Sequence, residues 1–154
     1  MQRSGDKQIT NSSAGELLLT SRDARGVLTL TLNDPARFNA LGGEMLAALQ
    51  EALDAAGRDE SVRVMVLAAA GKAFCAGHNL KDMAAHPDLG WYQQLFAQCS
   101  RMMLTIHKLP VPVIARVHGM ATAAGCQLVA QCDLAVAADS ATFATSGIHY
   151  GLFC

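Results

Sequence analysis

The stretch from Val113 to Asp133 places the strongest constraint on how this chain folds. It begins as a β-branched run behind Pro110 and Pro112, passes through Gly119 and a tract of small residues, and continues with apolar residues at helical spacing. This pattern predicts a strand, a tight crossing and a helix. Small residues at such a crossing let a ligand approach the backbone, and the first N–H groups of the helix have no internal partner. A developing oxyanion suits that place. Tight packing of the helix on a sheet is the simpler explanation of the same residues, and this stretch alone does not separate the two.

Composition excludes several classes of function. The chain has 154 residues, 51% hydrophobic and 16% charged, which suits one domain with a sizeable core. Its formal net charge of −1 gives no electrostatic footprint for nucleic acid or an anionic membrane. No apolar run approaches the roughly 18 residues of a membrane span, and the polar opening 1–7 lacks the apolar region of a signal peptide. We therefore expect no nucleic-acid partner, no membrane insertion and a cytoplasmic protein.

The cysteines indicate a reducing compartment. They are odd in number, irregularly spaced and set mostly among Ala, Val and Phe: Cys75, Cys99, Cys126, Cys132 and Cys154. Buried reduced thiols fit this pattern, and no pair has the spacing of a zinc or redox motif. We expect neither a metal site nor a disulfide.

The first half of the chain predicts a hairpin followed by a helix and a strand. Residues 1–14 are polar and aperiodic, which predicts a loose tail ahead of a domain at 15–154. Short alternating stretches at 17–20 and 26–32 predict paired strands, and Asn33-Asp34-Pro35 ends the second. Apolar residues recur at helical spacing through 43–57. The nearly continuous apolar run 62–69 predicts a strand buried on both faces.

The second half continues this alternation. A helix is expected at 89–107, where Pro110 stops it, and another buried strand at 133–138. The resulting order of strands and helices argues for an α/β domain. Beyond it, residues 143–154 have the composition of a loop that leads to a further element.

Four local patterns, taken in order, resemble the enoyl-CoA hydratase/isomerase family, also called the crotonase superfamily. Asp-Pro-Ala-Arg-Phe-Asn-Ala-Leu at 34–41 is similar to the family's Asn-Arg-Pro-x-x-x-Asn-Ala-Leu turn. Gly-Lys-Ala-Phe-Cys-Ala-Gly-His-Asn-Leu at 71–80 is similar to its Gly-x-x-Phe-x-x-Gly-x-Asp-Leu segment. Residues 117–133 are similar to its x-Gly-x-Ala-x-Gly-Gly-Gly-x-x-Leu-x-x-x-Cys-Asp segment, and 143–151 occupy the place of a fourth.

This resemblance implies a fold and an assembly. The fold is the crotonase-like spiral of strand-strand-helix units, also seen in ClpP. Members of the family are usually longer, so we expect the final spiral repeat and the C-terminal helices to be missing from these 154 residues. Those helices normally build the trimer, and the assembly that the resemblance implies is a homo-trimer or a hexamer.

The resemblance also implies a substrate and its binding residues. The substrate is an acyl-CoA thioester, with coenzyme A as part of the substrate and no other cofactor. Two backbone N–H groups hold the thioester oxygen as an enolate forms, and here they belong to His78 and Ala124. By the same comparison His78, Asn79, Leu80 and Lys81 line the path of coenzyme A and the acyl group. Arg37 or Lys81 meets the phosphates or the adenine region, although solvated surface charges explain both side chains equally well.

The chain departs from the family pattern at its acid/base pair. Hydratases of the family place water with two glutamates, and the matching positions hold Gln127 and Gly147. A glutamine amide does not take a proton at neutral pH, and glycine has no side chain, so ordinary hydratase activity is in doubt. Ala124 stands where the family has its central glycine, a change that is harmless where the position is helical.

Other groups near the motifs are candidates for replacing the missing acids. His78, His118 and His149 titrate in the range of a general base, and Ser146, Tyr150 and Asn79 offer hydrogen bonds to a substrate. For each histidine a purely structural role is the simpler explanation. Cys75 and Cys126 are weaker candidates as nucleophiles because no positive charge or base accompanies them.

Three hypotheses follow for the function. The first is an acyl-CoA-handling enzyme of the lyase or isomerase class, which stabilises a thioester enolate. The second is a non-catalytic acyl-CoA-binding or regulatory subunit. The third is a fragment that does not fold well alone and exposes apolar surface. For a processed eukaryotic protein the mitochondrial matrix is the alternative compartment to the cytoplasm.

Overall fold

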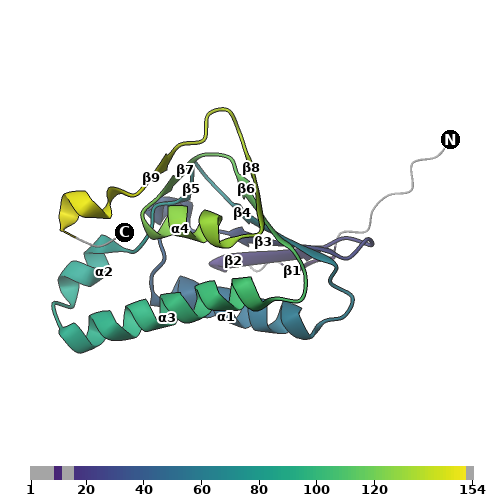
Figure 1. The fold of residues 1–154 in the computed structure, drawn as a ribbon, viewed down its shortest axis with the longest axis horizontal. Coiled ribbons are helices and arrows are strands. Elements are labelled where there is room, and N and C mark those ends of the chain that lie inside the picture. Colours follow the sequence, from purple (N-terminus) through teal and green to yellow (C-terminus); the bar gives the residue numbers. More distant parts are fainter. Residues whose placement is uncertain (1–8, 12–15, 152–154) are drawn as a thin grey trace.

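The computed structural model describes residues 9–11 and 16–151. Figure 1 shows two sheets with the longest helices, α1 and α3, beneath the larger one. In chain order the elements are β1 (Ile9–Asn11), β2 (Leu18–Arg22), β3 (Val27–Leu32), η1 (Pro35–Arg37), α1 (Gly43–Arg58), β4 (Val64–Ala69), β5 (Ala73–Cys75), α2 (Leu80–Ala85), α3 (Leu89–Lys108), β6 (Val113–Val117), β7 (Met120–Thr122), α4 (Ala124–Gln131), β8 (Leu134–Ala137), β9 (Phe143–Ala144) and η2 (Ser146–Tyr150).

The larger sheet has the strand order β1-β2-β3-β4-β6-β8. The first three strands are antiparallel, whereas β3, β4, β6 and β8 run parallel. Asp23 shapes the tight turn between β2 and β3, because its Oδ1 accepts from the N–H groups of Arg25 at 2.9 Å and Val27 at 3.0 Å. The hairpin, the helix after it and the parallel strands confirm the α/β fold expected from the sequence.

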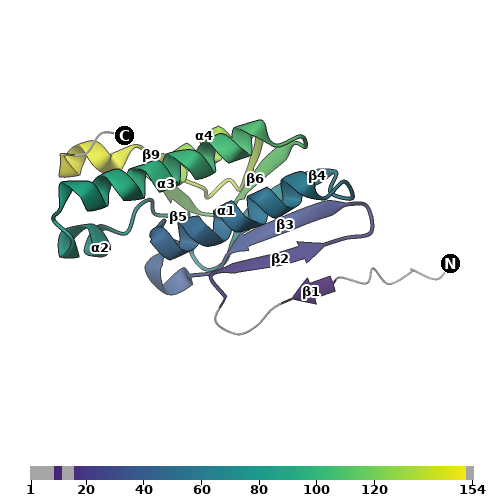
Figure 2. The same ribbon diagram turned by 90° about the horizontal axis from the view of Figure 1, so that it is seen from below.

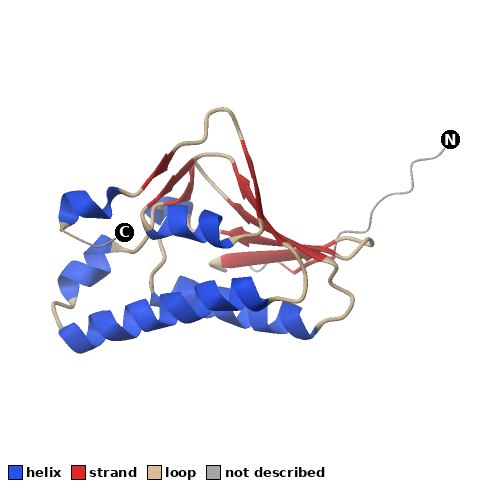
Figure 3. Ribbon diagram, viewed as in Figure 1, coloured by secondary structure: helices blue, strands red, loops and turns tan. Residues whose placement is uncertain are grey.

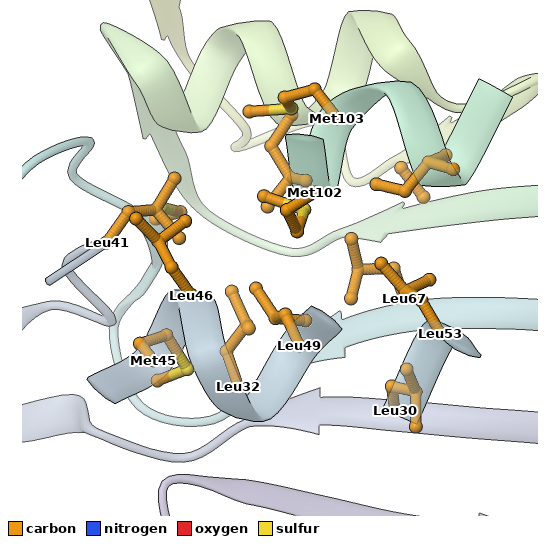
Figure 4. Close-up of a cluster of buried hydrophobic side chains, with 14 of the residues drawn as sticks. Leu30, Leu32, Leu41, Met45, Leu46, Leu49, Leu53, Leu67, Met102 and Met103 are labelled. Atoms are coloured by element: carbon orange, nitrogen blue, oxygen red, sulfur yellow. The ribbon is translucent and has the colours of Figure 1, made fainter. Parts of the chain in front are cut away.

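The core lies between this sheet and two helices that pack on each other. Along β3 every second residue is buried, and these are Leu28, Leu30 and Leu32. Leu49 of α1 and Met102 of α3 meet them from the helical side, as Figure 4 shows. Figure 2 shows α1 and α3 side by side along the sheet. Full burial of a leucine contributes roughly 1.5–3 kcal/mol, so this layer supplies much of the stability.

The smaller sheet was not expected from the sequence. Its strand order is β5-β7-β9, all parallel, and Figure 3 shows its short strands above α4. The chain therefore does not pass from β6 directly into a helix, because β7 intervenes before α4. A Cβ built on Gly119 would lie 2.4 Å from the carbonyl oxygen of Lys72. Glycine at that position lets the chain approach the start of β5 this closely.

Two expectations about burial are wrong. All four residues of β8 are exposed, with Leu134 at 61% and Val136 at 64%. The reason is its position at the sheet edge, where β6 is its neighbour on one side and no described strand lies on the other. Along β4, Val64 and Val66 are only half-buried, because α1 and α3 cover the opposite face of the sheet.

Part of the stretch expected to be a loose N-terminal tail forms a strand. Within residues 1–14, Ile9–Asn11 form β1 and pair with β2. The other residues of that stretch lie outside the described part, as do 152–154. Among the helices described, none combines the length and hydropathy that crossing a membrane requires.

Candidate active site

A turn at 34–41 supports the candidate site from one side. Pro35 begins η1, and the chain then places Phe38 and Asn39 at positive φ, 53° and 54°. Asn39 is fully buried, and its side chain makes hydrogen bonds at both ends. Its Oδ1 accepts from the Asp34 N–H at 2.8 Å, and its Nδ2 donates to the carbonyls of Ala70 at 2.8 Å and Ala73 at 2.9 Å. Asn39 belongs to the turn pattern at 34–41, but its buried hydrogen bonds could not be predicted; the only local signal was that asparagine tolerates positive φ better than most residues.

The backbone of the 71–79 segment is bonded directly to this turn. The Ala76 N–H donates to the Phe38 carbonyl at 3.0 Å, and the Leu41 N–H donates to the Gly77 carbonyl at 2.7 Å. The Gly77 carbonyl and the His78 N–H belong to one trans peptide unit, in which they point in opposite directions. Because the carbonyl is aimed at Leu41, the His78 N–H is aimed away from the turn.

The second backbone donor stands at the start of α4. Ala124 is the first helical residue, so its N–H has no carbonyl within the helix to receive it. A Cβ built on Gly77 would lie 3.1 Å from Ala124 N and 3.0 Å from Ala123 Cβ. The Gly77–His78 peptide therefore lies against the helix start, and the two candidate oxyanion donors belong to neighbouring segments.

Close packing of α4 fixes this arrangement. A Cβ built on Gly125 would lie 2.2 Å from the Cys75 carbonyl oxygen. The residue with unusual backbone angles is Ala123, at φ 50° and ψ −124°. Ala124 itself is helical, so alanine in place of the family's glycine causes no strain there. The strain of roughly 1–3 kcal/mol that such angles carry falls on Ala123.

Two contacts, with Leu41 and with Phe96, hold the His78 side chain. Its Nδ1 lies 3.1 Å from the Leu41 carbonyl oxygen, and its ring meets Phe96 edge-on at a centroid distance of 5.2 Å. A carbonyl only accepts, so we assign the proton to Nδ1, which leaves Nε2 as an acceptor. Burial lowers the pKa of this imidazole below its ordinary value, with the Leu41 hydrogen bond opposing the shift. The ring is therefore neutral at physiological pH.

The other expected binding residues lie on the surface nearby. Asn79 caps α2, where its Oδ1 accepts from the Lys81 N–H at 3.1 Å and its Nδ2 donates to Asp82 at 2.8 Å. Leu80 and Lys81 are exposed in the first turn of α2. Arg37 is 52% exposed and forms an ion pair with Asp34 at 2.6 Å.

Gln127 and Gly147, which the resemblance aligns with the two glutamates of the family's hydratases, lie on separate elements. Gln127 is exposed on α4, whereas Gly147 is buried in η2. A hydrogen bond of 2.9 Å between the hydroxyls of Thr122 and Ser146 ties η2 to the end of β7. The segment that contains Gly147 is thus attached to the residues that precede α4.

The remaining candidates differ in their surroundings. His118 Nε2 is bonded to the Gly71 carbonyl at 2.8 Å, and His149 is exposed in η2. Burial raises the pKa of the Cys75 thiol to about 12, which argues against a nucleophile, and Cys126 is half-buried. Within residues 9–11 and 16–151, no cluster of three or more His, Cys, Asp or Glu is placed to hold a metal ion.

The structure also contains a groove of about 640 Å³ between α1 and the β2–β3 hairpin. Its lining includes Leu18, Leu28, Ala52 and Arg22, and neither Gly77 nor Ala124 contributes to it. Volume alone favours this groove as a binding site. The groove and the two backbone N–H groups expected to hold an oxyanion therefore lie at different places in the structure.

Comparisons with known proteins identify relatives of the whole described domain. Residues 22–154 match the family described as Enoyl-CoA hydratase/isomerase. The mitochondrial enoyl-CoA hydratase domain-containing protein 3 of Xenopus laevis is 41% identical over 97% of this chain and 52% of its own length. The 1,2-epoxyphenylacetyl-CoA isomerase of Escherichia coli K12 is 39% identical over 87% of this chain and 52% of its own length.

A solved structure agrees with these relatives. The crystal structure of an enoyl-CoA hydratase from Mycobacterium smegmatis is 65% identical, with a TM-score of 0.89 over 90% of this chain and 54% of that chain. The chain thus spans about half the length of the relatives that it matches.

Proposed function

The chain belongs to the enoyl-CoA hydratase/isomerase family of the crotonase superfamily, and from this membership we propose that it binds an acyl-CoA thioester and stabilises its enolate. The N–H groups of His78 and Ala124 would receive the thioester oxygen as negative charge develops on it. The observation that supports this most is the contact of the Gly77–His78 peptide with the first residue of α4. A single donor of this kind contributes roughly 3–4 kcal/mol to transition-state stabilisation.

The backbone donors make few demands on side chains, which agrees with the residues found here. Alanine at 124 and histidine at 78 each supply an N–H. The dipole of α4 adds a favourable interaction with an anion at its first turn. An enolate would therefore be stabilised whether or not the acid/base pair of a hydratase is present.

We further propose that ordinary hydratase turnover is weak. Gln127 offers an amide and Gly147 offers no side chain where water addition needs a base and an acid. Of the three histidines, His78 is the candidate for moving a proton instead, because its imidazole is neutral and its Nε2 is left as an acceptor. An isomerase or another enolate reaction fits this site better than hydration does.

The coenzyme A portion would bind across α2 and the 34–41 turn. Asn79 and Leu80 would flank the thioester path, and the exposed charges of Arg37 and Lys81 would meet the phosphates. We propose no cofactor, since coenzyme A is part of the substrate.

The alternative function is a non-catalytic acyl-CoA-binding or regulatory subunit. In its favour are Gln127 and Gly147 at the positions that the resemblance assigns to the two glutamates. This alternative predicts thioester binding without turnover of any acyl-CoA, whereas the enzyme hypothesis predicts turnover of at least one.

Binding and hydration measured in parallel test the proposal. Acetoacetyl-CoA binding is followed by calorimetry, and bound enolate by its ultraviolet absorption band. Crotonyl-CoA hydration is assayed in the same buffer. We expect binding with an enolate band and little hydration. Absence of binding would refute the proposal, and rapid hydration would refute the weak-hydratase statement.

Two glycine variants supply the matched comparison. In Gly77→Ala the new methyl group would press on Ala124 N at a φ of 87°, which separates the two donors. In Gly26→Ala an even closer contact, 2.5 Å from the Ser61 carbonyl oxygen at a φ of 82°, occurs in the β2–β3 turn. Both changes destabilise the fold, but only Gly77→Ala should abolish the enolate band.

We also propose an assembly and a compartment. Four cysteines, Cys75, Cys99, Cys126 and Cys132, are free thiols, which favours the cytoplasm or the mitochondrial matrix. The assembly is a trimer or hexamer, as is usual in the family. Analytical ultracentrifugation tests the assembly, and fractionation of expressing cells tests the compartment.

A further inference from the structure

The buried side chain of Asn39 has no part in the function described so far. It is the only fully buried polar side chain in the part of the chain that the structure describes, and it makes three hydrogen bonds. We propose that Asn39 is a positioning residue that sets the direction of the His78 N–H. This inference rests on the proposed function, because that N–H is one of the two oxyanion donors.

The side chain joins two stretches that are distant in sequence. One end binds the Asp34 N–H within the turn, and the other end binds the carbonyls of Ala70 and Ala73, which flank the loop before β5. One donor group meets the amide oxygen and two acceptors meet the amide nitrogen, so only one orientation of the amide satisfies all three. Asn39 thereby fixes the distance between the turn and the 71–79 segment.

Hydrogen bonds of the Leu41 backbone connect the turn that contains Asn39 to Gly77 and His78. Two residues beyond Asn39, the Leu41 N–H holds the Gly77 carbonyl at 2.7 Å. The Leu41 carbonyl in turn accepts from His78 Nδ1 at 3.1 Å. Because the Gly77 carbonyl and the His78 N–H share one rigid peptide plane, a rotation that releases Leu41 also turns the donor.

A purely structural role predicts something different. If Asn39 only stabilised the fold, its loss would loosen β3 and β4 as much as the 71–79 segment. A positioning role predicts a local effect on that segment and on the enolate, with the core of the large sheet unchanged. Misplacement of a reacting group by about 1 Å costs on the order of 100-fold in rate.

Asn39→Asp provides a test with its own pH signature. The carboxylate keeps the acceptor for the Asp34 N–H but faces the two carbonyls without a donor. Once protonated, it regains one donor, so the defect should shrink as pH falls. The matched control is Asn33→Asp, because the hydrogen bond that the Asn33 side chain donates, to the Glu16 carbonyl at 2.9 Å, is exposed.

Two readouts are compared with the wild-type chain at each pH. The first is the enolate band of bound acetoacetyl-CoA, and the second is amide hydrogen exchange of 71–79 against 27–32. For Asn39→Asp at neutral pH we expect the enolate fraction to fall by about 100-fold, as expected when one oxyanion donor is lost. Exchange should rise only in 71–79, and both effects should diminish at lower pH. Asn33→Asp should show neither effect.

The outcomes separate this inference from the proposed function. Equal loosening of 71–79 and 27–32, or an enolate band that resists the change, overturns the positioning role while the proposed function stands. If wild-type chain gives no enolate band, the proposed function fails, and hydrogen exchange alone decides whether Asn39 positions the segment. If Asn39→Asp does not fold, Asn39→Ser removes both donor bonds without a charge and is judged by the same two readouts.

Discussion

The contact between α4 and β5 predicts that replacing Gly125 of α4 by alanine lowers the stability of the fold. In Gly125→Ala the new Cβ would lie 2.2 Å from the Cys75 carbonyl oxygen, whereas ordinary contact begins at 3.4 Å. The backbone of β5 cannot yield as a side-chain end does, so α4 has to move away from it. Such overpacking costs about 1–3 kcal/mol, and the gain from alanine in a helix is at most about 1 kcal/mol. Because the clash is with backbone, the cost should lie at the upper end of this range, and we expect a net loss of about 2 kcal/mol after the gain from alanine.

Gly57→Ala is the control, since Gly57 is also helical but faces Leu109 Cδ2 at 3.2 Å, the end of a flexible side chain. Here we expect a gain of about 0.5 kcal/mol. Urea unfolding followed by circular dichroism measures both variants. The reasoning is refuted if Gly125→Ala is as stable as the wild-type chain, or if the two variants lose stability equally. A shifted α4 also displaces the Ala124 N–H, so the enolate band should weaken in Gly125→Ala alone.

Three further predictions concern single groups. Because burial raises the pKa of the Cys75 thiol to about 12, alkylation at mildly alkaline pH should modify it only after unfolding; mass mapping that finds rapid native modification contradicts this. His78 has a pKa below 6.5 in the folded chain, so its unfolded form binds more protons and the free energy of unfolding should fall as pH drops below 6.5. In His78→Gln that dependence should be smaller, and an unchanged urea midpoint profile would contradict the burial of a neutral ring. Val136 is exposed on the edge strand β8, so Val136→Lys should reduce self-association in light scattering with a stability change within about 0.5 kcal/mol; unchanged association would contradict the role of that edge.

The long elements could be predicted because their periodicity extends over many residues. The helix expected at 43–57 is α1, and the helix expected at 89–107 is α3. Each observed helix ends one residue later than expected. Their apolar faces are defined by four or five turns of regular spacing. The short strands β5 and β7 have three residues each, which is too few for an alternating pattern to appear.

Burial depends on neighbours that a local pattern does not contain. The apolar composition of 133–138 indicated a buried strand, yet β8 is exposed because it lies at an edge. The exposed apolar residues there agree with one feature of the fragment hypothesis, namely uncovered apolar surface. The strand at 133–138 could be predicted from its composition, whereas its place at the edge of the sheet could not.

The segments expected to form the site are neighbours in the structure, whereas the roles of their residues stay predictions. The small residues at 119–125 left two explanations open, approach of a ligand and tight packing, and the contacts of Gly119 and Gly125 with neighbouring backbone show the tight packing. The bond partners of His78 and Asn39 could not be predicted, because each partner is distant in sequence. The positive φ was considered at Ala124 but occurs at Ala123, the residue between the end of β7 and the first residue of α4.

The strand order of the larger sheet, β1 to β8, follows the order of the chain. The smaller sheet does the same with β5, β7 and β9. During synthesis each new strand can therefore join a neighbour that the ribosome has already released. No strand has to be inserted between two that are already paired, so the domain can assemble from its N-terminal hairpin outward as translation proceeds.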